Sequence, residues 1–325
     1  MKRLIFWAGL ILCLLTVLSA CAQNETGTLV LLETDVSLPV SRMVWNKDGK
    51  VLTLVSPDSV TYIPTSDKAA PADIEKAQKG SEFADAGTGV AAALSADKKT
   101  ILVYTPGSDA KDVLSIEPGF TALSISLSED GKLVLADSAD EIRTVVYASK
   151  DGAMVYDLEG FQTAAPVYDS MLSRDGKYVL WHARGTFALQ NAADGKFYET
   201  ISLWDFASSY DLSPNNKVIA VGIIDDDYEN GAVIFFDAKT GDELGRTILP
   251  NVPYELSYSA DGSAIYAADA GTLYRINTKT YKVTKQYDLS SPGASENDRI
   301  SRIAAAPDGE SAAVLLSTGD LILVD

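Results

Sequence analysis

The sequence predicts an all-β fold, a seven-bladed β-propeller, from three observations. A tight turn of the type Ser-x-Asp-Gly-Lys recurs between short apolar runs, a pattern typical of antiparallel hairpins. The turns recur with a period of about 40 to 50 residues, which indicates a propeller or another repeat array. Beyond the N-terminal segment, helical spacing of apolar residues occurs only at 72–79, which is expected to be a loop or a single helical turn.

The turns are expected to join the first and second strands of each blade. They lie at Asp48-Gly49, Asp97-Lys98, Asp130-Gly131, Asp175-Gly176, Asn215-Asn216, Asp261-Gly262 and Asp308-Gly309. Each blade is then a small antiparallel sheet of three or four strands. The interval of 33 residues after Asp97 leaves room for only three strands in the second blade. Six or eight blades are therefore kept as alternatives.

The two ends of the domain predict how the ring closes. A third apolar strand ends 16 or 17 residues after four of the turns, at Pro64, Asn191, Asn277 and Asp325. The apolar strand from Thr28 to Glu33 has no unit of its own, and we expect it to complete blade 7. Closure of this kind removes exposed sheet edges. One propeller domain is expected over residues 27–325.

The segment from Leu172 to Leu180 resembles bacterial WD40-like propellers with TolB-type and YVTN-type repeats. The resemblance extends over the chain after the N-terminal segment, and it implies the architecture. Eukaryotic WD40 blades carry Gly-His and Trp-Asp pairs. This chain has one histidine, and Trp204-Asp205 falls outside the strand-ending register, so the eukaryotic family is not implied.

The N-terminus has the features of a bacterial export signal. Lys2 and Arg3 precede an apolar run that is shorter than the roughly 20 residues of a membrane-spanning helix. The junction Leu18-Ser19-Ala20-Cys21 resembles the lipobox of bacterial lipoproteins, which implies cleavage before Cys21 and its acylation by chains such as palmitate. Residues 1–20 are then a signal peptide and 21–26 a lipidated tether. An ordinary secretory signal ending in cysteine is the alternative.

Composition restricts the stabilising forces and the partners. Cys13 and Cys21 are the two cysteines, so a chain cleaved before Cys21 has no cysteine left to form a disulfide within the domain. The formal net charge of −18 becomes two units more negative once Lys2 and Arg3 are removed. Nucleic acid is therefore excluded as the expected partner. The expected location is the outer side of the cytoplasmic membrane or the outer membrane.

Alignment of the innermost strands on their turns separates two columns, because side chains alternate between the faces of a strand. The column three residues before each turn is apolar and is expected to pack between blades: Trp45, Leu94, Leu127, Leu172, Leu212, Tyr258 and Ala305. The column six residues before each turn is expected to line the central channel: Arg42, Ala91, Ser124, Asp169, Ser209, Glu255 and Arg302. Burial of its charged members between sheets is unfavourable.

The channel mouth is therefore the predicted binding site. Its candidate residues are Arg42, Asp169, Glu255 and Arg302, with Asp211 two residues deeper. Arg42 and Arg302 come from adjacent blades once the ring closes. The alternative is that these charges solvate a water-filled pore and form salt bridges with one another.

Two insertions are expected on the same face as the channel mouth. The third strands of blades 3 and 5 are expected to end 27 and 22 residues after their turns, so the connections before them are longer than elsewhere. In blade 5, Asp225, Asp227 and Glu229 are candidates for Ca²⁺ ligands, and their spacing differs from that of an EF-hand. In blade 3, Ala136 to Lys150 forms either an extended hairpin or a partner-binding loop. No other cofactor is expected.

The sequence favours a binding or scaffolding module of the cell envelope over an enzyme. Its partner is expected to be an envelope protein or a small ligand. The single histidine, His182, is expected to be structural, and the chain has no Gly-x-Ser-x-Gly motif. A lactonase-like or quinoprotein-like enzyme that uses the channel is the alternative.

The short tether predicts the orientation of the domain on the membrane. The lipid at Cys21 is expected on the side of the Asp-Gly turns, with the channel mouth pointing away. This expectation fails if Thr28 lies on the same face as Arg42 and Asp227.

Overall fold

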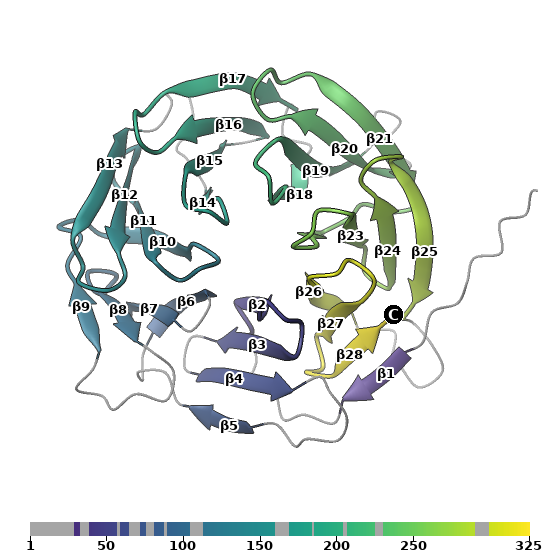
Figure 1. Cartoon of the computed structure of the whole chain (residues 1–325), viewed down its shortest axis with the longest axis horizontal. Helices are drawn as coiled ribbons and strands as arrows, with labels where there is room; N and C mark the ends of the chain where they lie inside the picture. The colour runs from purple at the N-terminus through teal and green to yellow at the C-terminus, as the bar shows by residue number, and fades with distance from the viewer. Residues whose placement is uncertain are drawn as a thin grey trace, which may run out of the picture.

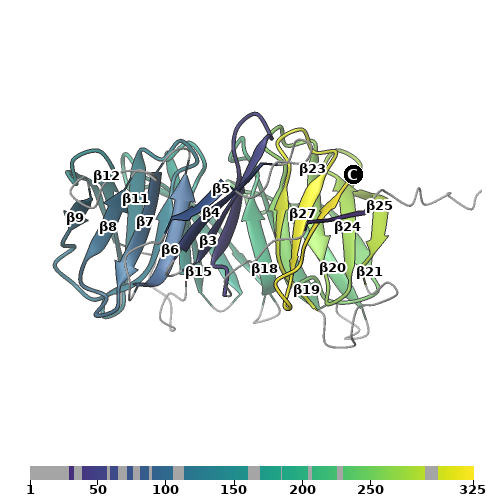
Figure 2. The same ribbon diagram turned by 90° about the horizontal axis from the view of Figure 1, so that it is seen from below.

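The computed structural model describes residues 29–32, 39–56, 59–64, 72–75, 81–87, 90–104, 113–159, 169–183, 185–203, 207–224, 230–289 and 299–325. In these ranges the regular secondary structure consists of β-strands alone. The strands form seven antiparallel sheets of four strands each, arranged around a central axis as the blades of a β-propeller (Figure 1). Figure 2 shows the ring edge-on. The predicted fold class and blade number are confirmed.

Each blade extends from an innermost strand at the axis to an outermost strand at the rim, in the following order. Blades 1 to 4 contain β2 (Arg42–Trp45), β3 (Val51–Ser56), β4 (Ser59–Pro64), β5 (Ala72–Glu75); β6 (Ser81–Gly87), β7 (Val90–Ser95), β8 (Ile101–Tyr104), β9 (Leu114–Ile116); β10 (Ala122–Leu127), β11 (Leu133–Ser138), β12 (Arg143–Ala148), β13 (Met154–Glu159); and β14 (Asp169–Leu172), β15 (Tyr178–Ala183), β16 (Thr186–Asn191), β17 (Phe197–Ser202). Blades 5 to 7 contain β18 (Ala207–Leu212), β19 (Val218–Ile224), β20 (Gly231–Asp237), β21 (Glu243–Leu249); β22 (Glu255–Tyr258), β23 (Ala264–Ala268), β24 (Thr272–Asn277), β25 (Lys282–Asp288); and β26 (Ile300–Ala305), β27 (Ala312–Leu316), β28 (Leu321–Val324), β1 (Leu29–Leu32).

The recurrent turn is stabilised by its own side chains, as blade 3 illustrates. Ser128 Oγ donates to Asp130 Oδ1 at 2.8 Å, and Leu133 N donates to Ser128 Oγ at 3.1 Å. Lys132 N donates to Asp130 Oδ1 at 3.1 Å. Gly131 has φ of 67°, a left-handed conformation that costs glycine little. The motif therefore specifies a hairpin locally, before any tertiary contact forms.

Blade 2 departs from the prediction in two respects. It has four strands rather than three, and its Asp97 turn joins the second and third strands, β7 and β8. The innermost strand is β6, which contacts β2 and β10 of the neighbouring blades. Ala91 therefore lies on β7, where it is fully buried, and its predicted place in the channel wall is wrong.

Two further local expectations are wrong. Part of the segment 72–79, expected as a loop or helical turn, forms the outer strand of blade 1, because Ala72 pairs with Tyr62 of β4. In blade 3 the connection between β11 and β12 is short, so the longer connection expected there is wrong, while the hairpin alternative for Ala136 to Lys150 is confirmed. Residue 157, which is 27 residues after Asp130, lies in the fourth strand, β13, and not in the third.

Ring closure follows the prediction. Strand β1 pairs antiparallel with β28 and completes blade 7, from Leu29 opposite Val324 to Leu32 opposite Leu321. Blade 7 is also linked to blade 1 near the axis, where Trp45 Nε1 donates to Ala304 O at 2.9 Å. The first and last segments of the domain are therefore held in one sheet.

The hydrophobic core is divided among the interfaces between neighbouring blades. Seven buried clusters each combine residues of two adjacent blades. The apolar column predicted to pack there is confirmed, because all its members are buried except the half-buried Trp45. Because neighbouring sheets pack face to face around the ring, each blade is buried on both sides.

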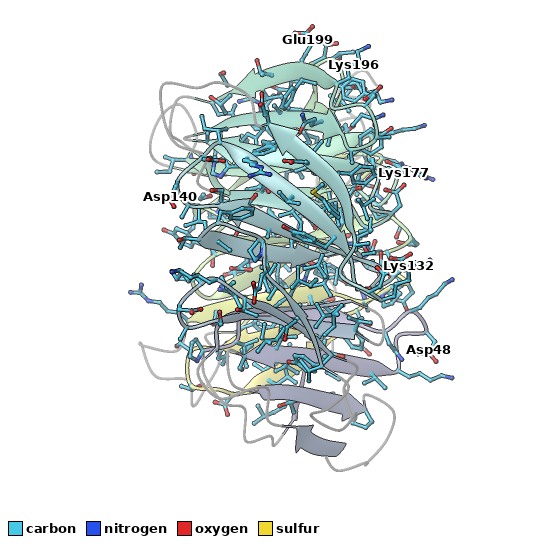
Figure 3. The ribbon with its side chains drawn as sticks, turned by 90° about the vertical axis from the view of Figure 1, so that its left-hand side faces the viewer. Asp48, Lys132, Asp140, Lys177, Lys196 and Glu199 are labelled. Carbon is cyan, nitrogen blue, oxygen red and sulfur yellow. The ribbon has the colours of Figure 1, made fainter. Side chains whose placement is uncertain are left out.

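The ring has two distinct faces. Asp48, Lys132 and Lys177 project on the face that carries the Asp-Gly turns, the turn face, while Asp140 projects from the opposite one, the entrance face (Figure 3). Leu29 pairs with Val324, which pairs with Ala312 just after the turn, so β1 begins on the turn face. Thr28, Cys21 and Asp227, on which the orientation prediction depends, lie outside the described residues. None of the described segments is a helix able to cross a bilayer.

Candidate functional site

A central cavity of about 320 Å³ follows the propeller axis. Its wall includes three arginines and three acidic residues: Arg42, Glu129, Arg174, Asp211, Glu255 and Arg302. The structure thus brings together four of the five predicted mouth residues. Asp169, the fifth, begins β14 opposite His182 in the sheet, and its side chain lies outside the described part of the chain.

The rest of the predicted channel column is placed elsewhere. Ser124 is buried and donates to Asp137 Oδ2 at 2.7 Å, inside blade 3. Ser209 donates to Pro253 O at 2.7 Å and borders a second cavity. Cys21 and the calcium candidates Asp225, Asp227 and Glu229 lie outside the described residues. The column therefore has mixed roles, and its charged members Arg42, Glu255 and Arg302 border the channel.

Glu255 and Arg302 form an ion pair at the mouth. Arg302 Nη1 lies 2.8 Å from Glu255 Oε1 and also donates to Ser301 O at 2.8 Å. Arg302 Nε reaches Ser41 O of blade 1 at 3.4 Å. Burial raises the pKa of Glu255, while the positive charge of Arg302 opposes that rise. The pair spans blades 6 and 7, so part of the predicted charge is neutralised within the wall.

Asp211 connects blades 5 and 6. Its Oδ2 accepts from Tyr258 N at 2.7 Å and its Oδ1 from Leu212 N at 2.8 Å. Burial raises the pKa of Asp211, and the positive charges of Arg174 and Arg42 counteract this. Since innermost strands have unpaired N–H groups toward the next blade, a side-chain oxygen at this position satisfies them.

Serines at the position equivalent to Asp211 have the same role in other blades. Leu172 N donates to Ser126 Oγ at 3.4 Å, and Ala305 N donates to Ser257 Oγ at 3.0 Å. Both bonds join neighbouring blades near the axis. Asp211 is therefore first a structural link, and its carboxylate is engaged on both oxygens.

Arg174 lines the channel at its turn-face end and was not predicted. Its Nη2 donates to Tyr258 O at 2.6 Å, so the side chain crosses from blade 4 to blade 6. Its Nη1 lies 3.9 Å from Glu129 Oε2 of blade 3. The available sequence signal was a charged residue directly before the turn aspartate, a position outside both aligned columns.

A second cavity of about 360 Å³, which we call the entrance pocket, adjoins the channel mouth. It is lined by Met171, His182, residues 207–210 and residues 254–256 from blades 4, 5 and 6. Met171, Tyr210, Glu255 and Leu256 line both cavities. The two cavities therefore adjoin each other at these four residues on the entrance side.

The wall of the entrance pocket depends on a glycine. Pro253 O accepts from Ser208 Oγ and from Ser209 Oγ, both at 2.7 Å. A Cβ at Gly222 would lie 2.3 Å from Ser209 Oγ and 2.8 Å from Pro253 O. Only glycine lets the connection between β21 and β22 approach β19 so closely, and that connection leads directly into Tyr254.

His182 lies at the back of this pocket. Its ring stacks on Phe187 with centroids 4.6 Å apart and contacts Tyr210 at 5.0 Å. Its Nε2 accepts from Gly185 N at 3.3 Å, so the neutral ring carries its proton on Nδ1. Burial lowers the pKa of His182 to about 4. The imidazole is consequently uncharged at neutral pH.

Groups of three or more potential metal ligands are not found among the residues that the structure describes. Among the described residues that line the two cavities, no hydrogen bond joins a nucleophile to a base. The arrangement supports recognition of a ligand through charge and aromatic contact.

Comparison with known proteins adds no family. No protein-family model matches the chain, and no curated protein matches it. The resemblance to WD40-like propellers therefore depends on repeat segments such as residues 172–180, and the resemblance to the lipobox depends on residues 18–21.

Proposed function

We propose that this chain is an exported, lipid-anchored propeller that serves as a binding or scaffolding module of the cell envelope. The observation that carries the proposal is the pair of adjoining cavities on the entrance side, where the channel mouth and the entrance pocket share Tyr210 and Glu255. Concave sites with a few placed polar groups are the usual ligand sites of proteins. The partner is an envelope protein or a small ligand that contacts this region.

The lipid anchor follows from the lipobox resemblance at Cys21. It agrees with the start of β1 on the turn face, because a tether that precedes Leu29 then leaves the entrance face directed away from the membrane. Acylation with two or more chains gives stable anchoring, whereas one chain is marginal.

Replacement of Cys21 with serine is expected to abolish acylation and to remove the mature, anchored form from the membrane fraction. Metabolic labelling with an alkyne fatty acid followed by fractionation measures both effects. Cys13→Ser is the matched control, since Cys13 lies inside the signal peptide and its loss leaves labelling unchanged. Labelling that persists in Cys21→Ser contradicts the anchor.

The binding role is tested by chemical crosslinking of intact envelopes and affinity capture of the full chain. A specific partner that depends on the entrance-face residue Tyr254, and is unaffected by Lys279→Ala on the turn face, supports the proposal. Failure to recover any partner, together with turnover on a panel of lactones and glycans, favours the enzyme alternative.

Metal content of the purified protein, measured by mass spectrometry, tests Ca²⁺ at Asp225, Asp227 and Glu229.

A further inference from the structure

We propose that the entrance pocket binds an organic cation, an ammonium or guanidinium group. The proposal rests on the proposed binding role and names the chemistry that this region recognises. It is carried by aromatic faces, a single carboxylate and the absence of lysine and arginine among the described residues that line the pocket. These features together select a positive charge over a neutral or negative group.

The aromatic surface is built from three rings. Tyr254 is 60% exposed at the rim, although its backbone N is fixed by a hydrogen bond to Ala268 O at 2.8 Å. Tyr210 and His182 form the inner wall, tilted by 54° to each other. The electron-rich faces of such rings attract cations, with the largest effect where the site is partly desolvated.

Glu255 supplies the one carboxylate at the inner edge of the pocket, and its ion pair with Arg302 offsets part of its charge. Arg302 approaches it from the channel side and occupies Oε1. For Oε2 the structure shows no hydrogen-bond partner among the described residues, and a carboxylate accepts from two directions. Oε2 is therefore the oxygen of this carboxylate that remains for a cation in the pocket.

The field of the whole molecule acts in the same direction. The full chain has a formal net charge of −18. Such a charge raises the local concentration of cations and their association rate. His182 is uncharged at neutral pH because burial lowers its pKa to about 4, so the imidazole does not repel the ligand.

The pocket is pre-organised. Ser208 and Ser209 hold Pro253 O from one side, and Gly222 allows this contact, so the backbone that leads into Tyr254 and Glu255 is fixed before a ligand arrives. Pre-organisation reduces the entropy lost on binding. A single charged group of small size can therefore bind measurably by itself.

The only histidine of the chain provides a reporter inside the pocket. We would label the full-length protein with ¹³C-histidine, hold it in a maltoside detergent and titrate capped Gly-Lys-Gly peptide while following the His182 resonance. The Nε-acetylated peptide is the neutral counterpart. Choline and 3,3-dimethylbutanol form a second pair of cation and neutral isostere. We expect a saturable shift of the His182 resonance with at least one of the two cations and no shift with the neutral compounds.

The two cations distinguish the source of the ligand. A response to the lysine peptide assigns the pocket to a basic side chain of a partner protein, and a response to choline alone assigns it to a free alkylammonium compound. Equal shifts with a cation and its neutral counterpart, or no shift with either cation, overturn the proposal.

Variants of the exposed Tyr254 test the geometry without disturbing the core. Tyr254→Ala is expected to weaken cation binding about fivefold, while Tyr254→Phe, which retains the aromatic face, stays within about twofold of the wild type. Wild-type affinity in Tyr254→Ala overturns the proposal. Capture of a partner from envelopes without cation binding removes this inference and leaves the proposed function. Cation binding without any captured partner supports this inference and counts against the proposed role as a partner-binding module.

Discussion

Replacement of Asp137 with alanine is expected to lower the free energy of unfolding by roughly 3 to 5 kcal/mol. Asp137 is 3% exposed, and its carboxylate accepts from the hydroxyl groups of Ser124, Thr144 and Ser170 and from Ser170 N. The first two donors belong to blade 3 and the others to blade 4. Removal of the carboxylate leaves buried donors unpaired and disconnects two blades. Denaturant unfolding of the full chain in detergent measures the loss.

Asp140→Ala is the matched control for this experiment. Asp140 lies in the same blade, in the turn after β11, and is exposed. Its replacement is expected to change the unfolding free energy by less than about 0.5 kcal/mol. If Asp137→Ala has the same unfolding free energy as Asp140→Ala, the assignment of Asp137 as an inter-blade link is contradicted.

Gly231→Ala is expected to destabilise the protein by about 3 kcal/mol. A Cβ at this position would lie 2.0 Å from Asn251 O and 2.5 Å from Asn251 C. The contacted atoms are backbone, and Asn251 is itself held by a hydrogen bond from its Nδ2 to Asp269 Oδ2 at 2.9 Å. The connection between β21 and β22 must therefore move, and with it the wall of the entrance pocket. Thermal unfolding gives the stability change.

Gly119→Ala isolates the backbone cost of losing a glycine. Gly119 has φ of 80°, and nothing lies within 4 Å of a Cβ placed there. The Gly119→Ala variant is expected to lose only about 1 kcal/mol of unfolding free energy. If Gly231→Ala and Gly119→Ala are equally stable, the close approach of Asn251 is not the cause of the destabilisation at Gly231.

The fold was predictable because its hairpins are specified locally. Ser128, Asp130 and Gly131 show how one motif supplies the hydrogen bonds and the positive φ of its own turn. The position of a hairpin within a blade has no such local signal. The Asp97 turn resembles the others, yet it joins the second and third strands, because blade 2 gains β6 on its inner side.

The candidate site was predictable only where strand alternation determines it. Arg42, Glu255 and Arg302 border the channel as the alignment predicted, although members of the apolar column line it as well. Tyr254 was missed because its position depends on a connection held across blades by Gly222 and two serines. Contacts of this kind join segments distant in sequence, so no periodic pattern marks them.

The central claim, that the entrance face is the binding surface, is tested most directly by site-specific photo-crosslinking in cells. A photoreactive residue is placed at Tyr254 on the entrance face or at Lys279, which is exposed in the turn after β24 on the opposite face. We expect a discrete crosslinked species from position 254 and none from position 279. Crosslinks from position 279 alone would contradict the account.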